Sequence, residues 1–139
     1  MLTRDDINEM LWKHLKALAE NGTIPIQGKV YNGERDLANV SEDITVKTTV
    51  VTGFGNRQRA DVNINVFVPD MKRSANVYVT DEGRIAQLSN AVLAFIKTID
   101  YLLPVSGTVS CTEHEFEEAA LHQHYENFLV SMNIYDNNQ

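Results

Sequence analysis

Apolar residues recur at helical spacing in the first segment of the chain. Over residues 4–20 they form one stripe, which consists of Ile7, Met10, Leu11, Leu15 and Leu18. Thr3 and Asp6 match the capping-box pattern at its start. Asn21-Gly22 follows, and both residues tolerate the left-handed backbone of a helix end. The pattern predicts an amphipathic helix over residues 4–20.

A second helical stripe occupies residues 81–102. It consists of Ile85, Leu88, Val92, Phe95 and Ile99. Small alanines beside this stripe would let the helix approach a sheet closely. Thr80 or Asp81 can cap the helix, and Pro104 follows its predicted end.

Alternation of apolar and polar residues predicts strands in two adjacent segments. Five apolar residues share one face of residues 60–68: Ala60, Val62, Ile64, Val66 and Val68. Three share one face of residues 43–52: Ile44, Val46 and Val50. This patterning is typical of a half-buried antiparallel pair, with residues 53–59 as the hairpin loop. Pro69 is expected to end the pairing, because it has no N–H to donate.

The remaining segments are assigned from weaker signals. Residues 69–75 are predicted to be a loop, and further strands are predicted at about 105–115 and 123–135 with a turn near 117–121. Residues 28–43 follow neither period, although residues 27–31 could form a short strand. A connection this long is uncommon in a compact domain unless it is functional or mobile. We therefore predict an extended, partly exposed arm at about 28–43.

These elements predict one α+β domain over residues 1–139. The order is helix, arm, hairpin, helix, hairpin, which gives an antiparallel or mixed sheet of about four to five strands packed by two helices. A polar tail is expected at about 136–139.

Charge and composition narrow the classes of function. Twelve basic and nineteen acidic residues give a formal net charge of −7, which argues against non-specific binding to nucleic acid or to an anionic membrane. No apolar run approaches the roughly 20 residues that cross a bilayer, and early acidic residues disfavour a signal peptide. A single cysteine excludes an internal disulfide. These features predict a soluble protein that is intracellular when made.

The best metal candidate is an alternating run near the C-terminus. His122, His124 and Glu126 would share one strand face, with His114 and Cys111 on the preceding strand. The same parity continues into apolar residues, so a core face that ends in solvent explains the run more simply. We therefore predict no metal and no cofactor.

No catalytic residue is predicted elsewhere. Four glutamates form an acidic cluster that we interpret as an exposed loop surface: Glu113, Glu115, Glu117 and Glu118. The glycines at 53 and 55 lack the spacing of a phosphate-binding loop. Cys111 has no adjacent histidine motif and is interpreted as a small buried residue.

The layout and one phrase of the sequence resemble a family of viral structural proteins. The phrase is GKVYNGERDLANVSEDITV followed by ADVNINVFVPD. It is similar to tail-completion and tail-terminator proteins of tailed bacteriophages and prophages, in particular those of phage-like elements of Bacteroidetes-type bacteria. The resemblance covers most of the chain and includes no catalytic motif. Asp36 stands where this phrase elsewhere has a proline.

The resemblance implies a non-enzymatic protein that assembles as a ring, commonly a hexamer, at the head-proximal end of a phage tail. Such a ring would contact other tail or connector proteins, in the host cytoplasm during assembly and later in the virion. We expect assembly contacts from the arm, the hairpin loop and one helix face: Tyr31, Asn32, Glu34, Arg35, Asp36, Phe54, Arg57, Arg59 and Trp12. The acidic cluster would face a partner, or a lumen where it repels DNA. A small intracellular protein-binding module without catalytic activity is the alternative.

Overall fold

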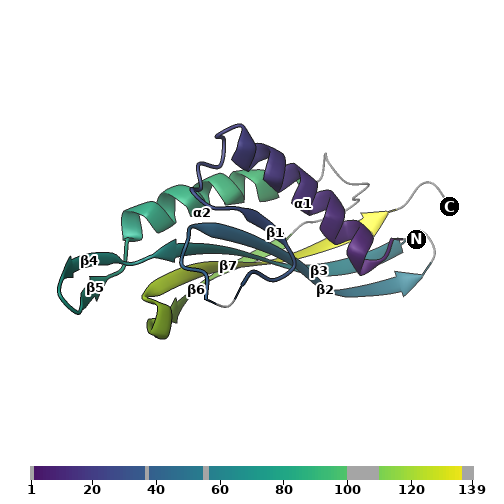
Figure 1. Ribbon diagram of the computed structural model, residues 1–139. Helices are drawn as coiled ribbons and strands as arrows, with labels where there is room; N and C mark the ends of the chain where they lie inside the picture. Colours follow the sequence, from purple (N-terminus) through teal and green to yellow (C-terminus); the bar gives the residue numbers. More distant parts are fainter. Residues whose placement is uncertain (1, 37, 55–56, 100–109, 136–139) are drawn as a thin grey trace.

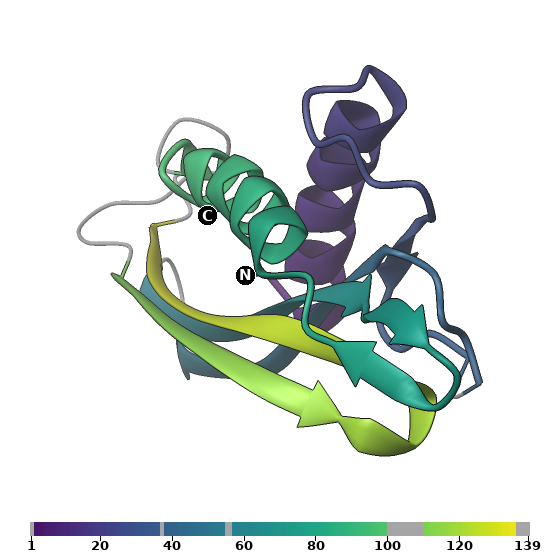
Figure 2. The same cartoon turned by 90° about the vertical axis from the view of Figure 1, so that its left-hand side faces the viewer.

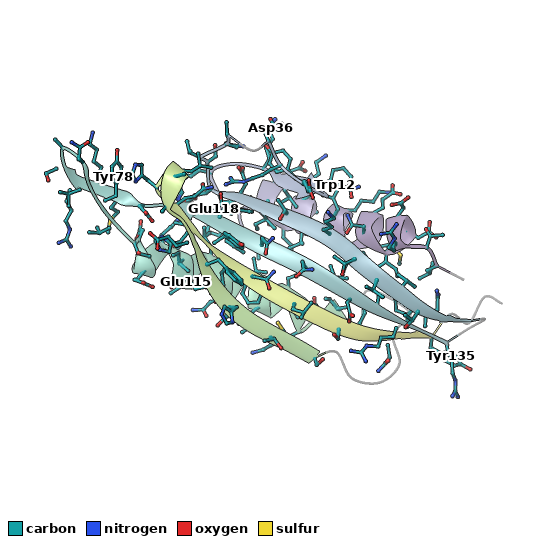
Figure 3. The ribbon with its side chains drawn as sticks, turned by 90° about the horizontal axis from the view of Figure 1, so that it is seen from below. Trp12, Asp36, Tyr78, Glu115, Glu118 and Tyr135 are labelled. Atoms are coloured by element: carbon teal, nitrogen blue, oxygen red, sulfur yellow. The ribbon has the colours of Figure 1, made fainter. Side chains whose placement is uncertain are left out.

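Two helices cover one face of a five-stranded sheet (Figures 1 and 2). The structure is a computed structural model that describes residues 2–36, 38–54, 57–99 and 110–135. The helices are α1 (Arg4–Glu20) and α2 (Glu82–Ile96). Within these ranges the opposite face of the sheet carries no helix (Figure 3). The predicted α+β class is therefore confirmed.

The main sheet has the strand order β1-β2-β3-β7-β6. The bounds of its strands are β1 (Val30–Asn32), β2 (Asp43–Phe54), β3 (Arg57–Pro69), β7 (Gln123–Tyr135) and β6 (Ser110–Glu118). β1 runs parallel to β2, whereas the other neighbours are antiparallel, so the sheet is mixed. Three short elements complete the description: β4 (Met71–Ser74) and β5 (Val77–Val79), which form a separate hairpin, and η1 (Ala119–Leu121).

Helix α1 begins and ends where the sequence predicts. The Thr3 hydroxyl accepts a hydrogen bond from the Asp6 N–H at 3.1 Å, and the Asp6 carboxylate accepts one from the Thr3 N–H at 2.8 Å. This reciprocal pair is the expected capping box. Asn21 is the C-cap, and Gly22 adopts a φ of +83°. The inner stripe is fully buried at Ile7, Leu11 and Leu15.

Helix α2 is capped by Asp81, whose carboxylate accepts a hydrogen bond from the Arg84 N–H at 3.2 Å. The five residues of its predicted stripe are all buried: Ile85, Leu88, Val92, Phe95 and Ile99. Helix α2 ends at Ile96 with Lys97 as its C-cap, so the predicted continuation to residue 102 is wrong. Residues 105–109 and the tail at 136–139 lie outside the described residues.

The core lies between the helices and the inner faces of β2, β3 and β7. The inner residues of β3 are those predicted: Ala60, Val62, Ile64, Val66 and Val68. Those of β7 are Phe128, Val130, Met132 and Ile134. Pairing of β3 with β7 ends at Pro69, as expected for a residue without an N–H.

The predicted inward orientation of Val50 is wrong. The register between β2 and β3 shifts between Thr48 and Val50, which marks a β-bulge or similar irregularity. An inserted residue reverses the alternation, so Thr48 is buried whereas Val50 is 44% exposed. Ile44 and Val46 precede the shift and are buried as predicted.

Three predicted loops are partly strand. β2 continues to Phe54 and β3 begins at Arg57, so both Arg57 and Arg59 belong to β3 rather than to a loop. The predicted loop at 69–75 contains β4. β6 continues to Glu118, which places Glu117 and Glu118 on a strand rather than in a turn. In each case the strand is exposed and carries mostly polar side chains, so its sequence looks like that of a loop.

Candidate functional site

The segment predicted as an arm is docked against the edge of the sheet. Its first strand, β1, pairs with β2, and the Gly33 N–H donates to the Val46 carbonyl at 2.8 Å. The Gly28 N–H donates to the Glu42 carbonyl at 2.9 Å, which brings the two ends of the segment together. A Cβ at position 28 would collide with that carbonyl and with the Asp43 carboxylate. The segment is partly exposed, and hydrogen bonds attach it to the edge of the sheet.

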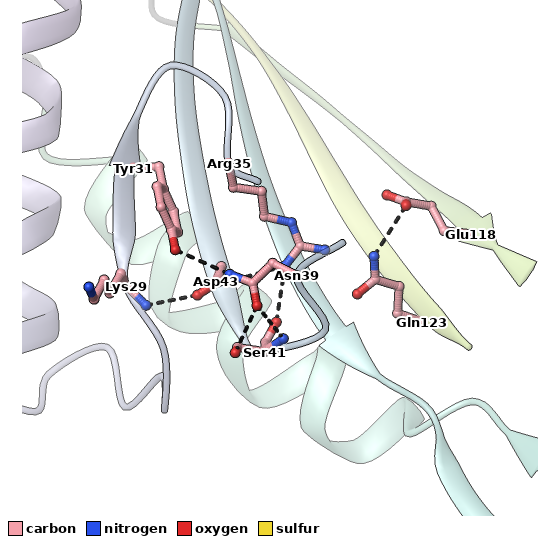
Figure 4. Close-up of polar contacts among 8 residues, drawn as sticks. All are labelled: Lys29, Tyr31, Arg35, Asn39, Ser41, Asp43, Glu118 and Gln123. Atoms are coloured by element: carbon pink, nitrogen blue, oxygen red, sulfur yellow. Dashed lines mark hydrogen bonds and ion pairs between the residues drawn. The ribbon is translucent and has the colours of Figure 1, made fainter. Parts of the chain in front are cut away.

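A buried ion pair holds the centre of this segment (Figure 4). The Arg35 guanidinium donates to the Asp43 carboxylate at 2.8 Å and to the Ser41 carbonyl at 3.2 Å. The side chains of Arg35 and Asp43 are only 6% and 1% exposed. The guanidinium also stacks 3.7 Å from the ring centroid of Phe67, and the Lys29 N–H donates to the second Asp43 oxygen at 2.9 Å. Arg35 was predicted to be an assembly contact, and one nitrogen of its guanidinium donates to both of these internal acceptors.

The other residues predicted for the arm divide into internal and external groups. The Asn39 amide donates to the Tyr31 hydroxyl at 3.1 Å (Figure 4), and the Asn32 side chain accepts from Asn8. Glu34 and Asp36 are exposed, with Glu34 bound to Lys47 at 2.7 Å on the surface. Assembly contacts from these exposed residues remain predictions.

The residues predicted to make assembly contacts outside the arm also divide into internal and external groups. The Trp12 indole N–H donates to the Val30 carbonyl at 2.9 Å, so its polar group anchors β1 to α1. Arg57 and Arg59 are exposed on β3, and Arg59 lies 3.7 Å from the Asp61 carboxylate. The Phe54 side chain lies outside the described residues.

Asn8 is an internal residue that the sequence pattern does not identify. Its amide nitrogen donates to the Val46 carbonyl at 2.9 Å, and its oxygen accepts from the Thr48 N–H at 2.7 Å. These are backbone groups of β2 at the end of β1: Val46 is the partner of Asn32, and Thr48 lies beyond the last β1 pair. One side-chain amide on α1 therefore continues the edge pairing that β1 begins. The sequence did contain one signal for this role, since Asn8 is a polar residue beside the buried stripe of α1.

A second ion pair joins the end of the arm to α2. Arg84 donates to both oxygens of Glu42, at 2.6 and 2.8 Å, and to the Pro25 carbonyl at 2.6 Å. Glu42 also accepts from the Gln27 N–H at 3.1 Å. The hydrogen bonds that Arg84 donates to Glu42 raise the pKa of Arg84. Both ends of the arm are thus fixed by carboxylates that sequence reasoning did not single out.

Of the predicted run, His124 and Glu126 share one face of β7, whereas His122 does not. His122 precedes β7 with a left-handed φ of +51°, and its ring stacks on Tyr78 with centroids 3.6 Å apart. His124 uses both ring nitrogens, with Asp70 at 2.7 Å and Thr80 at 3.3 Å. Across the described ranges, no group of three or more His, Cys, Asp and Glu residues is arranged to hold a metal ion.

The chain from Thr80 through His124 to Asp70 has the hydroxyl–imidazole–carboxylate order of a catalytic relay. None of the three residues lines one of the pockets found in the described residues. These contacts instead join the base of the β4–β5 hairpin to the start of β7. The Asp70 N–H adds a bond to the His122 carbonyl at 2.8 Å.

The β4–β5 hairpin projects from one end of the sheet (Figure 1). All four residues of β4 are exposed, and Met71 and Val77 are 45% and 46% exposed. Lys72 and Arg73 lie at the centre of β4. The hairpin contributes no residue to the hydrophobic core that the described residues form.

The acidic cluster is divided between the two faces of β6. Glu118 lies beside the arm, accepts from the Gln123 amide at 3.2 Å, and lines a cavity of about 260 Å³ with Arg35 and Phe67 (Figures 3 and 4). Glu113 and Glu115 instead line a cavity of about 350 Å³ beneath α2, together with Glu126. The predicted single acidic surface is therefore two separate ones.

Glu126 lies at the floor of the cavity beneath α2 and is 8% exposed. Burial, with the charges of Glu113 and Glu115, raises its pKa to about 7. Cys111 lies on the same edge strand and is exposed, contrary to its predicted burial, because β6 has only one neighbour among the described strands. Partial burial and Glu113 raise the pKa of its thiol, which disfavours the reactive thiolate.

The helix-free face of the sheet carries an aromatic row at one end. Phe67 and Tyr125 lie 5.0 Å apart, and Tyr125 and Phe116 lie 5.1 Å apart. His114 continues the row 5.0 Å from Phe116. The row crosses β3, β7 and β6 and meets Arg35 of the arm.

Comparison with known proteins adds no relative to this description. No protein-family model matches the chain, and no curated protein is significantly similar to it in sequence. Among the described residues, no helix combines the length and apolar character needed to cross a membrane.

Proposed function

We propose that this protein is a structural protein that assembles with copies of itself, in the manner of a phage tail-terminator or tail-completion ring. The ring would also contact neighbouring tail or connector proteins. The observation that carries the proposal is the β4–β5 hairpin, which is held in place but directs its side chains into solvent.

A hairpin of two short strands is marginally stable by itself in water. Here its base is fixed by the Asp70–His124–Thr80 contacts and by the stacking of Tyr78 on His122. Met71 and Val77 expose apolar side chains to water, and burial of these side chains against another protein would be favourable. A fixed element with exposed apolar and basic groups loses little conformational entropy when it binds, so it favours a contact with another protein.

The charge of the chain is compatible with this role. A net charge of −7 would keep a ring lumen from binding DNA through its phosphates. A closed ring of identical subunits also requires two different surfaces on each subunit. The hairpin would provide one such surface, and the outer edge of β6 could provide the other.

The test is the mass of the particle in solution. Light scattering after size-exclusion chromatography is expected to show an oligomer, and negative-stain electron microscopy is expected to show rings. A variant with residues 71–79 replaced by a short Gly-Ser turn should keep the wild-type circular dichroism spectrum but become a monomer. A wild-type protein that stays monomeric at high concentration contradicts the proposal.

A protein-binding module is the second candidate, and the edge strand favours it. Among the described strands β6 pairs only with β7, so its outer backbone groups could pair with an extended peptide. Its exposed glutamates would select a basic partner. A monomer that binds a basic peptide along β6 would favour this function over self-assembly.

A further inference from the structure

We propose that the acidic cavity between α2 and β6 receives the basic β4–β5 hairpin of a second copy of this chain. The inference rests on the self-assembly proposed above and identifies the surfaces that meet. The contact would be head-to-tail, since the hairpin of one subunit binds a different surface of the next.

The receiving surface is a cavity of about 350 Å³ rich in carboxylates. Its acidic residues come from three elements: Glu82 from α2, Glu113 and Glu115 from β6, and Glu126 from β7. None of them forms a salt bridge with a lysine or arginine of the described chain. Four carboxylates that share one cavity without a counter-charge repel one another, so the site favours a cationic group.

A separate observation shows an unfilled polar contact in the same cavity. Ser89 of α2 lines it and is only 6% exposed. Its hydroxyl oxygen has no hydrogen-bond partner among the described residues. A buried polar group without a partner destabilises the protein. A donor that enters from outside, such as an ammonium or guanidinium group, would satisfy both the hydroxyl and the carboxylates.

The donating surface is the β4–β5 hairpin. Lys72 and Arg73 are exposed on β4, and neither forms a salt bridge with a carboxylate of the described chain. Exposed Met71 and Val77 flank them and could cover apolar surface around the cavity. The contacts of Asp70 and Thr80 with His124 fix the base of the hairpin that carries these two basic residues.

The hairpin does not fold into the cavity of its own chain, since none of residues 71–79 lines that cavity. In the view of Figure 2 the hairpin lies to the right of α2. A rigid hairpin so placed can reach the cavity of a neighbour. Repetition of this contact around a closed path gives a ring, and repetition along an open path gives a filament.

Charge reversal tests the pairing. One variant carries Lys72→Glu and Arg73→Glu, and another carries Glu113→Lys and Glu115→Lys. All four residues are exposed, so both variants are expected to fold, which circular dichroism can verify. Controls with the same change in net charge carry Lys13→Glu and Lys97→Glu, or Glu9→Lys and Glu20→Lys, at exposed positions elsewhere.

Each reversal variant alone should dissociate at concentrations at least tenfold higher than wild type, whereas the controls should assemble normally. An equimolar mixture of the two reversal variants should assemble again, because every hairpin then meets a cavity of opposite charge. If the wild type assembles but the reversal variants assemble equally well, or if the mixture does not recover, the inference is wrong and self-assembly stands. A monomeric wild type overturns both.

Discussion

The docked arm (residues 28–43) and the β4–β5 hairpin are both polar connections, but they direct their polar groups in opposite directions. Arg35 and Asp43 of the arm are buried and bind each other, and Glu42 binds Arg84. Lys72 and Arg73 of the hairpin point into solvent. The arm therefore stabilises the fold of its own chain, whereas the hairpin has its contacts at its base and its side chains available to a partner.

The largest expected effect comes from the buried ion pair of the arm. Arg35→Ala should lower the free energy of unfolding by about 3–5 kcal/mol, because it leaves the Asp43 carboxylate buried without its counter-charge. Urea denaturation measures the change. Glu34→Ala removes the exposed pair with Lys47 and should alter stability little. Equal small effects for both variants would show that the arm is not held by its centre.

The next effect concerns the cavity that would receive the hairpin. The pKa of Glu126 is raised to about 7 in the folded protein, so the unfolded chain releases this proton at lower pH. Folded stability should fall as pH rises from about 4.5 to about 7, by up to about 3 kcal/mol.

Glu126→Gln removes that dependence, so the stability difference between variant and wild type should grow across this pH window. Denaturation at several pH values, in the background of Lys72→Glu and Arg73→Glu to prevent assembly, measures it. A difference that does not vary with pH would show that Glu126 is not buried among like charges.

Asn8 tests the edge of the sheet beside the arm. Asn8→Leu should cost about 2 kcal/mol, because the buried Thr48 N–H loses its acceptor, whereas the Val46 carbonyl keeps its hydrogen bond from the Gly33 N–H. Asn133→Leu, at an exposed position of β7, is the matched control and should change stability by less than about 0.5 kcal/mol. Similar losses in urea denaturation would argue against a special role for the Asn8 amide.

The smallest effect on stability is expected at the hairpin. Lys72→Ala with Arg73→Ala should change the free energy of unfolding by less than about 0.5 kcal/mol, because both side chains are exposed. The same variant should lose self-association in light scattering. A large loss of stability would instead assign the hairpin to the fold, as for the arm.

Sequence periodicity was sufficient for the elements that bury apolar residues. The stripes of α1 and α2 and the inner face of β3 are as predicted, since each depends on one regular period. It was insufficient where one residue breaks the period, as between Thr48 and Val50. It also failed for exposed strands such as β4 and the end of β6, whose side chains are polar throughout.

The polar sites were harder to predict, because partners lie far apart in sequence. Arg84 is 42 positions from Glu42, and Thr48 is 40 positions from Asn8. No local pattern encodes such pairs, so Asn8 was not noticed. Arg35 binds Asp43 only eight positions away, but the segment between them follows neither the helical nor the strand period, so its internal pairing was missed as well. His122 and His124 are two positions apart, yet a left-handed residue at 122 sends their rings to different partners.

Amide hydrogen exchange at the two connections tests the central distinction most directly. Exchange should be measured on the wild-type protein at concentrations above and below the one at which the oligomer dissociates. Mass spectrometry should follow peptides that cover residues 28–43 and 71–79. The arm should be equally protected at both concentrations, and the hairpin should gain protection only in the oligomer. Protection of the arm that depends on assembly, with no change in the hairpin, would contradict the account.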